Sequence, residues 1–105
     1  MKKIDEATLQ KLKAEHGDGL YLLEAGDYSI VARAPGRQIW KKFRATLTTD
    51  RKAESLELLV RDCLVHPAGA EFEAMLEERP GLAETFGNEL ADIAGAGDEA
   101  ERRKL

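Results

Sequence analysis

Two short apolar runs in the first third of the chain predict a β-hairpin. Residues 20–24 and 28–33 are rich in aliphatic, β-branched and aromatic side chains, and Gly26 and Asp27 lie between them. Runs of this composition joined by a short Gly-Asp connection are typical of two antiparallel strands. We therefore expect a hairpin over residues 20–34. A lone hairpin is marginally stable in water, so it must pack on helices or pair with another chain.

The rest of the chain has apolar residues every three or four positions, which is the spacing of a helix face. A first helix precedes the hairpin, with Asp5 as its N-cap and Gly17 at its end. Four more helices are expected within residues 35–94. Their predicted stretches are 35–47, 56–64, 72–79 and 82–93, with residues 48–50 joining the first two. A helix, a hairpin and then a bundle of about four short helices predict an α+β fold.

The length of 105 residues fits one domain, which we place at residues 1–94. Residues 95–105 lack an apolar period and are expected to form a polar flexible tail. We expect the following residues to be among the most buried side chains: Phe43, Leu59, Phe72, Phe86 and Leu90. Gly87 interrupts the last apolar stripe at a cost of about 1 kcal/mol relative to Ala. We therefore expect a close contact or a local break at Gly87.

Composition points to a cytoplasmic protein. The longest uncharged apolar runs span a few residues, whereas a membrane helix needs about 20. The first six residues lack the apolar stretch of a secretion signal. Cys63 is the one cysteine of the chain, which excludes an internal disulfide and fits a reducing compartment.

Charge is distributed unevenly around a formal net charge of -4. Residues 1–52 carry eleven Lys and Arg against seven Asp and Glu, whereas residues 53–105 carry five against thirteen. The densest basic stretch is 33–52, and the densest acidic stretch holds Glu71, Glu73, Glu77 and Glu78. Two interpretations remain open: the two faces attract each other within one fold, or each meets a partner of opposite charge.

Cys63 and His66 are the residues that most resemble a reactive site. Structural zinc takes four ligands, and the other histidine, His16, lies far along the chain without a neighbouring cysteine. A catalytic Cys-His pair also needs an orienting group and an oxyanion site, which the sequence does not identify. We expect a buried, slowly reacting cysteine, no metal, no cofactor, no catalytic residues, and hence no enzyme.

The basic helix at 35–47 is the candidate site for a partner. Arg37, Lys41 and Arg44 line one of its faces, and Trp40 lies at the edge. Basic side chains beside an indole could bind nucleic acid. Nucleic-acid-binding domains are usually strongly basic, however, and this chain has a pI near 5.2. Trp40 is more often a half-buried core residue than a stacking platform. A third interpretation is a surface for an acidic or amphipathic partner helix.

The order of these segments resembles a family of small phage proteins. The segments that carry the resemblance are 31–35, 39–43, 58–67, 72–76, 79–82 and 86–90. In this order they are similar to the tail assembly chaperones of phages and prophages. None of these segments contains a catalytic motif. The resemblance therefore rests on their order, which is a strand, a helix that begins at a proline, and a last helix that follows a Pro-Gly pair.

The resemblance implies a non-enzymatic role in the cytoplasm of a bacterial host. Such proteins bind the long helical tape measure protein, keep it soluble until the tail tube forms, and are absent from the finished tail. Arg37, Trp40, Lys41 and Arg44 are then the expected partner-binding residues, and other tail proteins or a second copy are further possible partners. The alternatives are a structural tail or neck subunit and a small regulatory nucleic-acid-binding domain.

Overall fold

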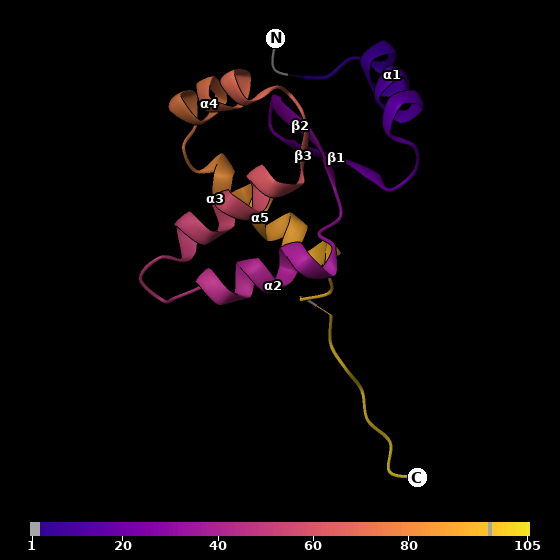
Figure 1. Ribbon diagram of the computed structural model, residues 1–105, viewed down its shortest axis with the longest axis vertical. Helices are drawn as coiled ribbons and strands as arrows, with labels where there is room; N and C mark the ends of the chain where they lie inside the picture. The colour runs from indigo at the N-terminus through magenta and orange to yellow at the C-terminus, as the bar shows by residue number, and fades with distance from the viewer. Residues whose placement is uncertain (1–2, 97) are drawn as a thin grey trace.

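Five helices and three strands follow one another in the computed structural model, which describes residues 3–96 and 98–105 (Figure 1). In chain order they are α1 (Glu6–His16), β1 (Leu20–Ala25), β2 (Tyr28–Arg33), α2 (Arg37–Thr46), α3 (Lys52–Cys63), β3 (Leu64–His66), α4 (Gly69–Glu78) and α5 (Leu82–Ile93). An N-terminal helix, an antiparallel hairpin and four further helices confirm the predicted α+β fold.

The hairpin has the predicted antiparallel form. β1 pairs with β2 so that Leu23 lies opposite Ile30 and Ala25 lies opposite Tyr28. Gly26 has a positive φ of 61°, and no residue other than glycine has a positive φ within the described part of the chain. A two-residue connection with glycine first is the geometry of a type II′ turn, which matches the twist of the flanking strands.

Residues 64–66 form a third strand, and this corrects the sequence-based expectation. The helix was expected to include Leu64 and to end before Pro67, but α3 ends at Cys63. β3 then pairs antiparallel with β2, with Leu64 opposite Ala32 and a register shift between Val31 and Ala32. A strand this short has no local signature. It exists because β2 offers backbone partners, while its two apolar residues merely prolong the helical pattern.

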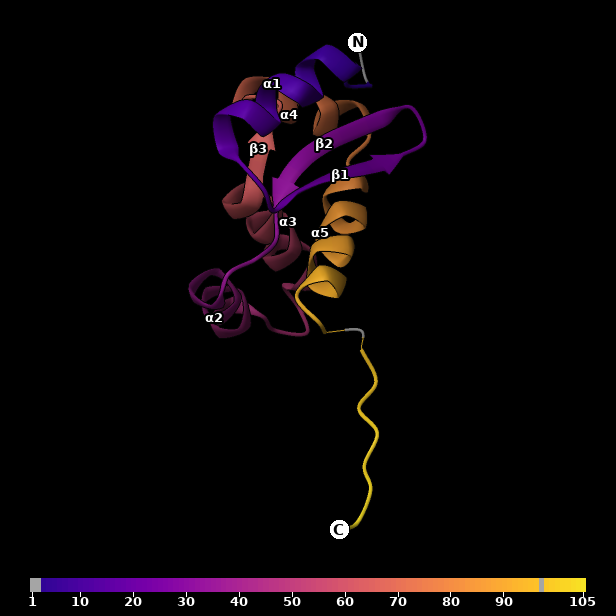
Figure 2. The same ribbon diagram turned by 90° about the vertical axis from the view of Figure 1, so that its right-hand side faces the viewer.

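The main core lies on one face of the sheet, against α3 and α5 (Figure 2). From β2, Tyr28, Ile30 and Ala32 point into it, as the alternation along a strand requires. The five side chains expected to be most buried are all buried: Phe43, Leu59, Phe72, Phe86 and Leu90. The predicted core is therefore confirmed.

The opposite face of the sheet is covered by α1 (Figure 2). Asp5 caps this helix as predicted, because its Oδ1 accepts a hydrogen bond of 2.8 Å from the Thr8 N–H. Ser29 Oγ of β2 accepts a second bond, of 3.1 Å, from the Ile4 N–H. Leu12 is the buried residue of α1 and lies outside the main core. The sheet thus separates a large hydrophobic core from a small one.

Helices α3 and α5 approach each other closely at Gly87. A Cβ atom at this position would lie 2.8 Å from the Leu56 Cβ and 3.0 Å from the Leu56 carbonyl oxygen. The expected close contact at Gly87 is therefore confirmed. α3 is also tied to the end of α2, where the buried Ser55 hydroxyl donates to the Thr46 carbonyl at 3.0 Å.

The chain beyond α5 leaves the body of the molecule (Figure 1). Residues 98–105 form neither helix nor strand and are exposed. None of the helices in the described residues is long and apolar enough to cross a membrane.

Candidate partner-binding site

Helix α2 begins at Arg37, two residues after the predicted start at Pro35. Gly36 occupies the N-cap position with extended backbone, so Pro35 belongs to the connection from β2 and not to the first turn. The helix ends at Thr46, with Leu47 as its C-cap. The predicted connection at residues 48–50 is confirmed, since α3 begins at Lys52.

The inner side of α2 packs on the main core. Phe43 is buried, and Ile39 and Trp40 are half-buried against the core. The rings of Trp40 and Phe43 lie 5.1 Å apart at an interplanar angle of 41°, a tilted aromatic contact. Part of the indole therefore stabilises the fold, and the rest remains accessible at the edge of α2.

The outer side of α2 carries three exposed cations. Arg37, Lys41 and Arg44 are spaced by one helical turn each, so they share one face and span roughly 10 Å along the axis. Within residues 3–96 and 98–105, none of the three forms an ion pair or a side-chain hydrogen bond. We call these three residues the α2 cation face.

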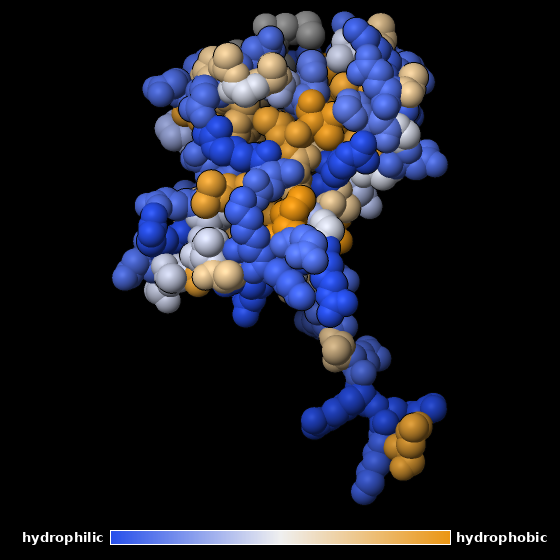
Figure 3. All heavy atoms as spheres, in the orientation of Figure 1, coloured by the Kyte–Doolittle hydropathy of each residue, from blue (hydrophilic) through white to orange (hydrophobic). Residues whose placement is uncertain are grey.

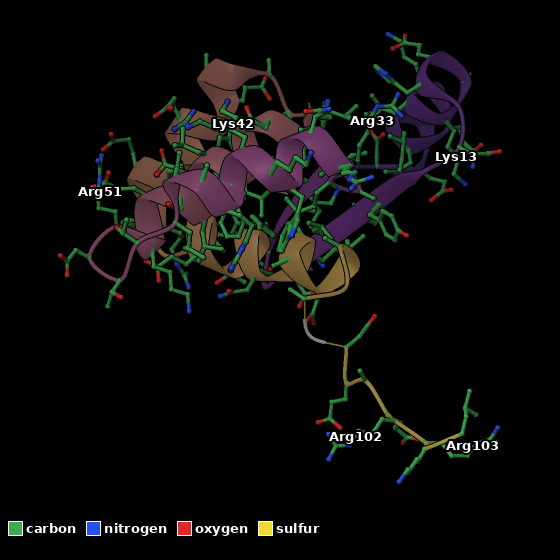
Figure 4. The ribbon with its side chains drawn as sticks, turned by 60° about the horizontal axis from the view of Figure 1, so that its bottom comes forward. Lys13, Arg33, Lys42, Arg51, Arg102 and Arg103 are labelled. Carbon is green, nitrogen blue, oxygen red and sulfur yellow. The ribbon has the colours of Figure 1, made fainter. Side chains whose placement is uncertain are left out.

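Three neighbouring cations that Figure 4 labels, Arg33, Lys42 and Arg51, are paired within the fold, whereas Lys52 of α3 has no ion pair among the described residues. Lys42 forms an ion pair of 3.1 Å with Asp62 of α3, and Arg51 forms one of 2.7 Å with Glu54. Arg33 donates to the His16 carbonyl at 3.0 Å. The α2 cation face thus differs from these neighbours in having its charge directed at solvent.

The acidic helix α4 does not neutralise this face. α4 and α2 lie at opposite ends of the folded body in both ribbon views (Figures 1 and 2). Glu73 instead accepts from Arg61 of α3, and Glu78 accepts a 2.9 Å bond from the Tyr28 hydroxyl. No ion pair joins α4 to α2 among the residues that the structure describes. Attraction between the basic and acidic stretches within one fold, which is one of the two interpretations of the charge pattern, does not account for Arg37, Lys41 and Arg44.

Apolar surface is exposed between the two ends of the body that α2 and α4 occupy. Figure 3 shows hydrophobic side chains gathered in the middle of one face, above α2 and in the region of β3. Leu64 and Val65 of β3 are half-buried and line a cavity of about 360 Å³ together with Phe72. On α3, Leu58 is 45% exposed. A partner that extends from α2 across this face would meet apolar as well as basic groups.

Cys63 and His66 have separate surroundings. Cys63 is buried in the main core, and this burial, with a smaller contribution from the charge of Asp62, raises the pKa of its thiol to about 11. The predicted burial of Cys63 is confirmed. His66 lines a different cavity, of about 490 Å³, beside the N-terminal segment and α4. In the described ranges, no three His, Cys, Asp or Glu residues are grouped so as to hold a metal ion.

The larger cavity was not anticipated from the sequence. It is bordered by Tyr28 and Ser29 of β2, by Glu78 and other residues of α4, and by residues of the N-terminal segment, α1 and β3. The Tyr28 hydroxyl is engaged by Glu78, and the Arg79 guanidinium lies over the Tyr28 ring at 5.8 Å. These polar groups bind one another, so we assign them a structural role.

Exposed apolar residues on β1 were also missed. Tyr21 and Leu22 are 44% and 41% exposed. A signal for them exists in the sequence: residues 20–23 are four consecutive apolar positions, whereas a strand with one buried face needs every second position.

Comparison with known proteins gives a family and a fold. A family model described as a domain of unknown function, DUF6848, matches residues 12–103. A solved structure of an uncharacterised protein from Bacillus stearothermophilus is similar, with a TM-score of 0.78 and 21% identity. The similarity covers 90% of this chain and 99% of that one. At this identity the similarity establishes the fold alone. Curated protein sequences give no significant match.

Proposed function

The chain belongs to the DUF6848 family, a domain of unknown function, and we propose that it is a non-enzymatic phage tail assembly chaperone. In this proposal it acts in the cytoplasm of the bacterial host, binds the tape measure protein and keeps that protein soluble during tail assembly. The partner-binding residues are Arg37, Lys41 and Arg44, with Trp40 beside them.

The observation that carries this proposal is the α2 cation face. Its three side chains are exposed and unpaired within the described residues, while nearby Lys42 and Arg51 have acidic partners. Charge left uncompensated on one helix face favours a partner of opposite charge and speeds its encounter. An acidic stripe on a partner helix, with carboxylates one turn apart, would match the spacing of the three cations.

The apolar surroundings support a helical, amphipathic partner. Trp40 is half-buried at the edge of α2, and hydrophobic side chains are gathered above this helix (Figure 3). Tryptophan and arginine are the residue types that most often dominate interface energies. A long helical protein with exposed apolar surface is prone to aggregate, and a small protein that covers this surface reversibly keeps it in solution.

Charge reversal on the α2 cation face tests the proposal. The double variant Arg37→Glu and Lys41→Glu is co-expressed with a tape measure protein from the same genome, and soluble complex is measured by affinity capture. We expect capture to be lost and the tape measure protein to precipitate. The free energy of unfolding should change by only a few tenths of a kcal/mol, as is typical for exposed charges.

A matched control carries the same change of charge elsewhere. Lys13 of α1 and Lys52 of α3 are exposed and have no ion pair among the described residues. The double variant Lys13→Glu and Lys52→Glu should capture the tape measure protein as the wild type does. Unimpaired capture by the α2 variant would refute the proposed surface.

Two further measurements separate the alternative functions. Detection of the chain in purified phage particles would indicate a structural tail or neck subunit instead of a chaperone. Tight binding to duplex DNA, falling steeply with added salt and abolished by the α2 double variant, would indicate a nucleic-acid-binding domain. Either result would reject the chaperone.

A further inference from the structure

Strand β1 is an open edge of the sheet. The strand order is β1-β2-β3, so β1 has β2 as its one neighbour among the described residues. β1 is six residues long and has one charged side chain, Glu24, which pairs with Lys3 at 3.3 Å. The strand contains no lysine, proline or bulge. Proteins usually protect a free edge with one of these features, because unpaired backbone groups invite another strand.

The register of the hairpin identifies the backbone groups at this free edge. Ala25 and Tyr28 flank a two-residue turn, so they form a hydrogen-bonded pair. Bonded and non-bonded pairs alternate along an antiparallel ladder, so Tyr21 and Leu23 also bond to β2. The N–H and C=O groups of the alternate residues, Leu20, Leu22 and Glu24, point away from β2.

The side chains along this edge are unusually apolar for an exposed strand. Tyr21, which shares the face of the main core, is 44% exposed. Leu22, which shares the face of α1, is 41% exposed. A cavity of about 290 Å³ adjoins Leu22 between β1 and α1. Its apolar lining comes from Leu9, Leu12, Leu20, Leu22 and Val31.

We propose that this edge pairs with β1 of a second copy of the chain, in antiparallel register about a two-fold axis at Leu22. Leu22 then lies opposite Leu22 of the second copy, and Leu20 lies opposite Glu24 of the second copy. The two three-stranded sheets become one sheet of six strands. The interface is isologous, so it closes at two copies.

A second copy is the occupant that the strand itself specifies. In this register all three outward residues meet outward residues, and about six backbone hydrogen bonds form. The two Glu24 carboxylates do not face each other, because each lies opposite a leucine. On the other face Tyr21 meets Leu23 of the second copy. The two exposed apolar side chains of the edge, Tyr21 and Leu22, thus each meet a leucine, while Leu20 meets Glu24.

Sedimentation equilibrium tests the dimer. Wild-type protein at tens of micromolar is expected to have a mass of about 23 kDa, twice the 11.6 kDa of one chain. Leu22→Lys places two like charges directly opposite each other and is expected to reduce the mass to that of the monomer. Leu58→Lys is the matched control, because Leu58 on α3 is 45% exposed and distant from this edge in the chain. It should remain dimeric.

Cysteine substitution tests the register. The Cα atoms of opposite residues in a hydrogen-bonded pair are about 5.5 Å apart, which a disulfide can bridge. Leu22→Cys is therefore expected to form a covalent dimer on mild oxidation. Glu24→Cys, on the same edge, should not, because the two copies of residue 24 are roughly four residues, or about 13 Å, apart along the strands.

The outcomes are decisive in each direction. A wild-type mass of 11.6 kDa at every concentration overturns the proposal and leaves the edge to an extended segment of another protein. A dimer that Leu22→Lys leaves intact, or cross-linking by Glu24→Cys in place of Leu22→Cys, overturns the proposed pairing. Capture of the tape measure protein by the monomeric Leu22→Lys variant would separate this inference from the proposed function, since the α2 cation face is unchanged in it.

Discussion

Replacing Gly87 with alanine probes the contact that holds α3 against α5. The new Cβ would lie 2.8 Å from the Leu56 Cβ and 3.0 Å from the Leu56 carbonyl oxygen. Ordinary contacts of this kind begin near 3.4 Å. Both atoms of Leu56 are fixed to the backbone, so a rotamer change cannot relieve the overlap. The two helices would have to separate by roughly 0.6 Å at this point.

The magnitude follows from two opposing effects. Overpacking a well-packed core costs about 1–3 kcal/mol. Alanine in place of glycine within a helix stabilises the helix by about 1 kcal/mol. Because backbone-fixed atoms place the cost in the upper part of its range, we expect Gly87→Ala to lower the free energy of unfolding by about 1–2 kcal/mol. This is a measurable part of the roughly 5–15 kcal/mol available to a small domain.

Urea and thermal unfolding followed by circular dichroism measure this effect. Each kcal/mol corresponds to a change of about 4–8 °C in Tm for a domain of this size. Gly69→Ala is the control, since Gly69 is the first residue of α4 and a Cβ there meets nothing within 4 Å. Its stability should be equal to that of the wild type or higher. A Gly87→Ala variant as stable as the wild type would refute the close packing of α3 on α5.

Further predictions concern two residues of the core, Phe86 and Cys63. Phe86→Ala should lower the free energy of unfolding by about 3–5 kcal/mol, because Phe86 is 1% exposed; an unchanged Tm would mean that α5 is peripheral. Cys63 should react slowly with a thiol reagent at neutral pH and rapidly in denaturant, and rapid labelling of the folded protein would contradict its burial. Between about pH 9 and pH 11 the unfolded chain loses the thiol proton while the folded chain, with its raised pKa of about 11, retains it. The free energy of unfolding should therefore fall over this interval, and less so in Cys63→Ala.

Local patterns in the sequence were sufficient for most elements of the fold. The Gly26-Asp27 turn, the Asp5 cap and the four-residue spacing of Ile39 and Phe43 each act within a few residues, so they can be read directly. β3 could not be read in this way. Leu64 and Val65 continue the apolar pattern of α3, and the strand is defined by backbone partners on β2, more than thirty residues earlier.

The sequence was sufficient to predict which charged residues form the candidate site, but not which of them have ion-pair partners. The excess of cations in residues 33–52 is visible in the sequence. Which of them are compensated depends on the packing of α2 on α3, which brings Lys42 to Asp62 and leaves Arg37 and Lys41 facing solvent. The open edge of β1 was equally hidden, since the order of strands in a sheet is a tertiary property.

The division of the molecule by its sheet has a consequence for its motions. α1 is anchored by one buried leucine, a hydrogen bond from Arg33 to its His16 carbonyl, a bond from the preceding Ile4 to Ser29 and a small apolar contact, whereas the main core holds the other helices. Such an element can open as a unit while the rest stays folded. Amide hydrogens of α1 would then exchange through a local opening of low energy and weak denaturant dependence. Amide hydrogens of β2, α3 and α5 would exchange through global unfolding. The two cores would then open as separate cooperative units.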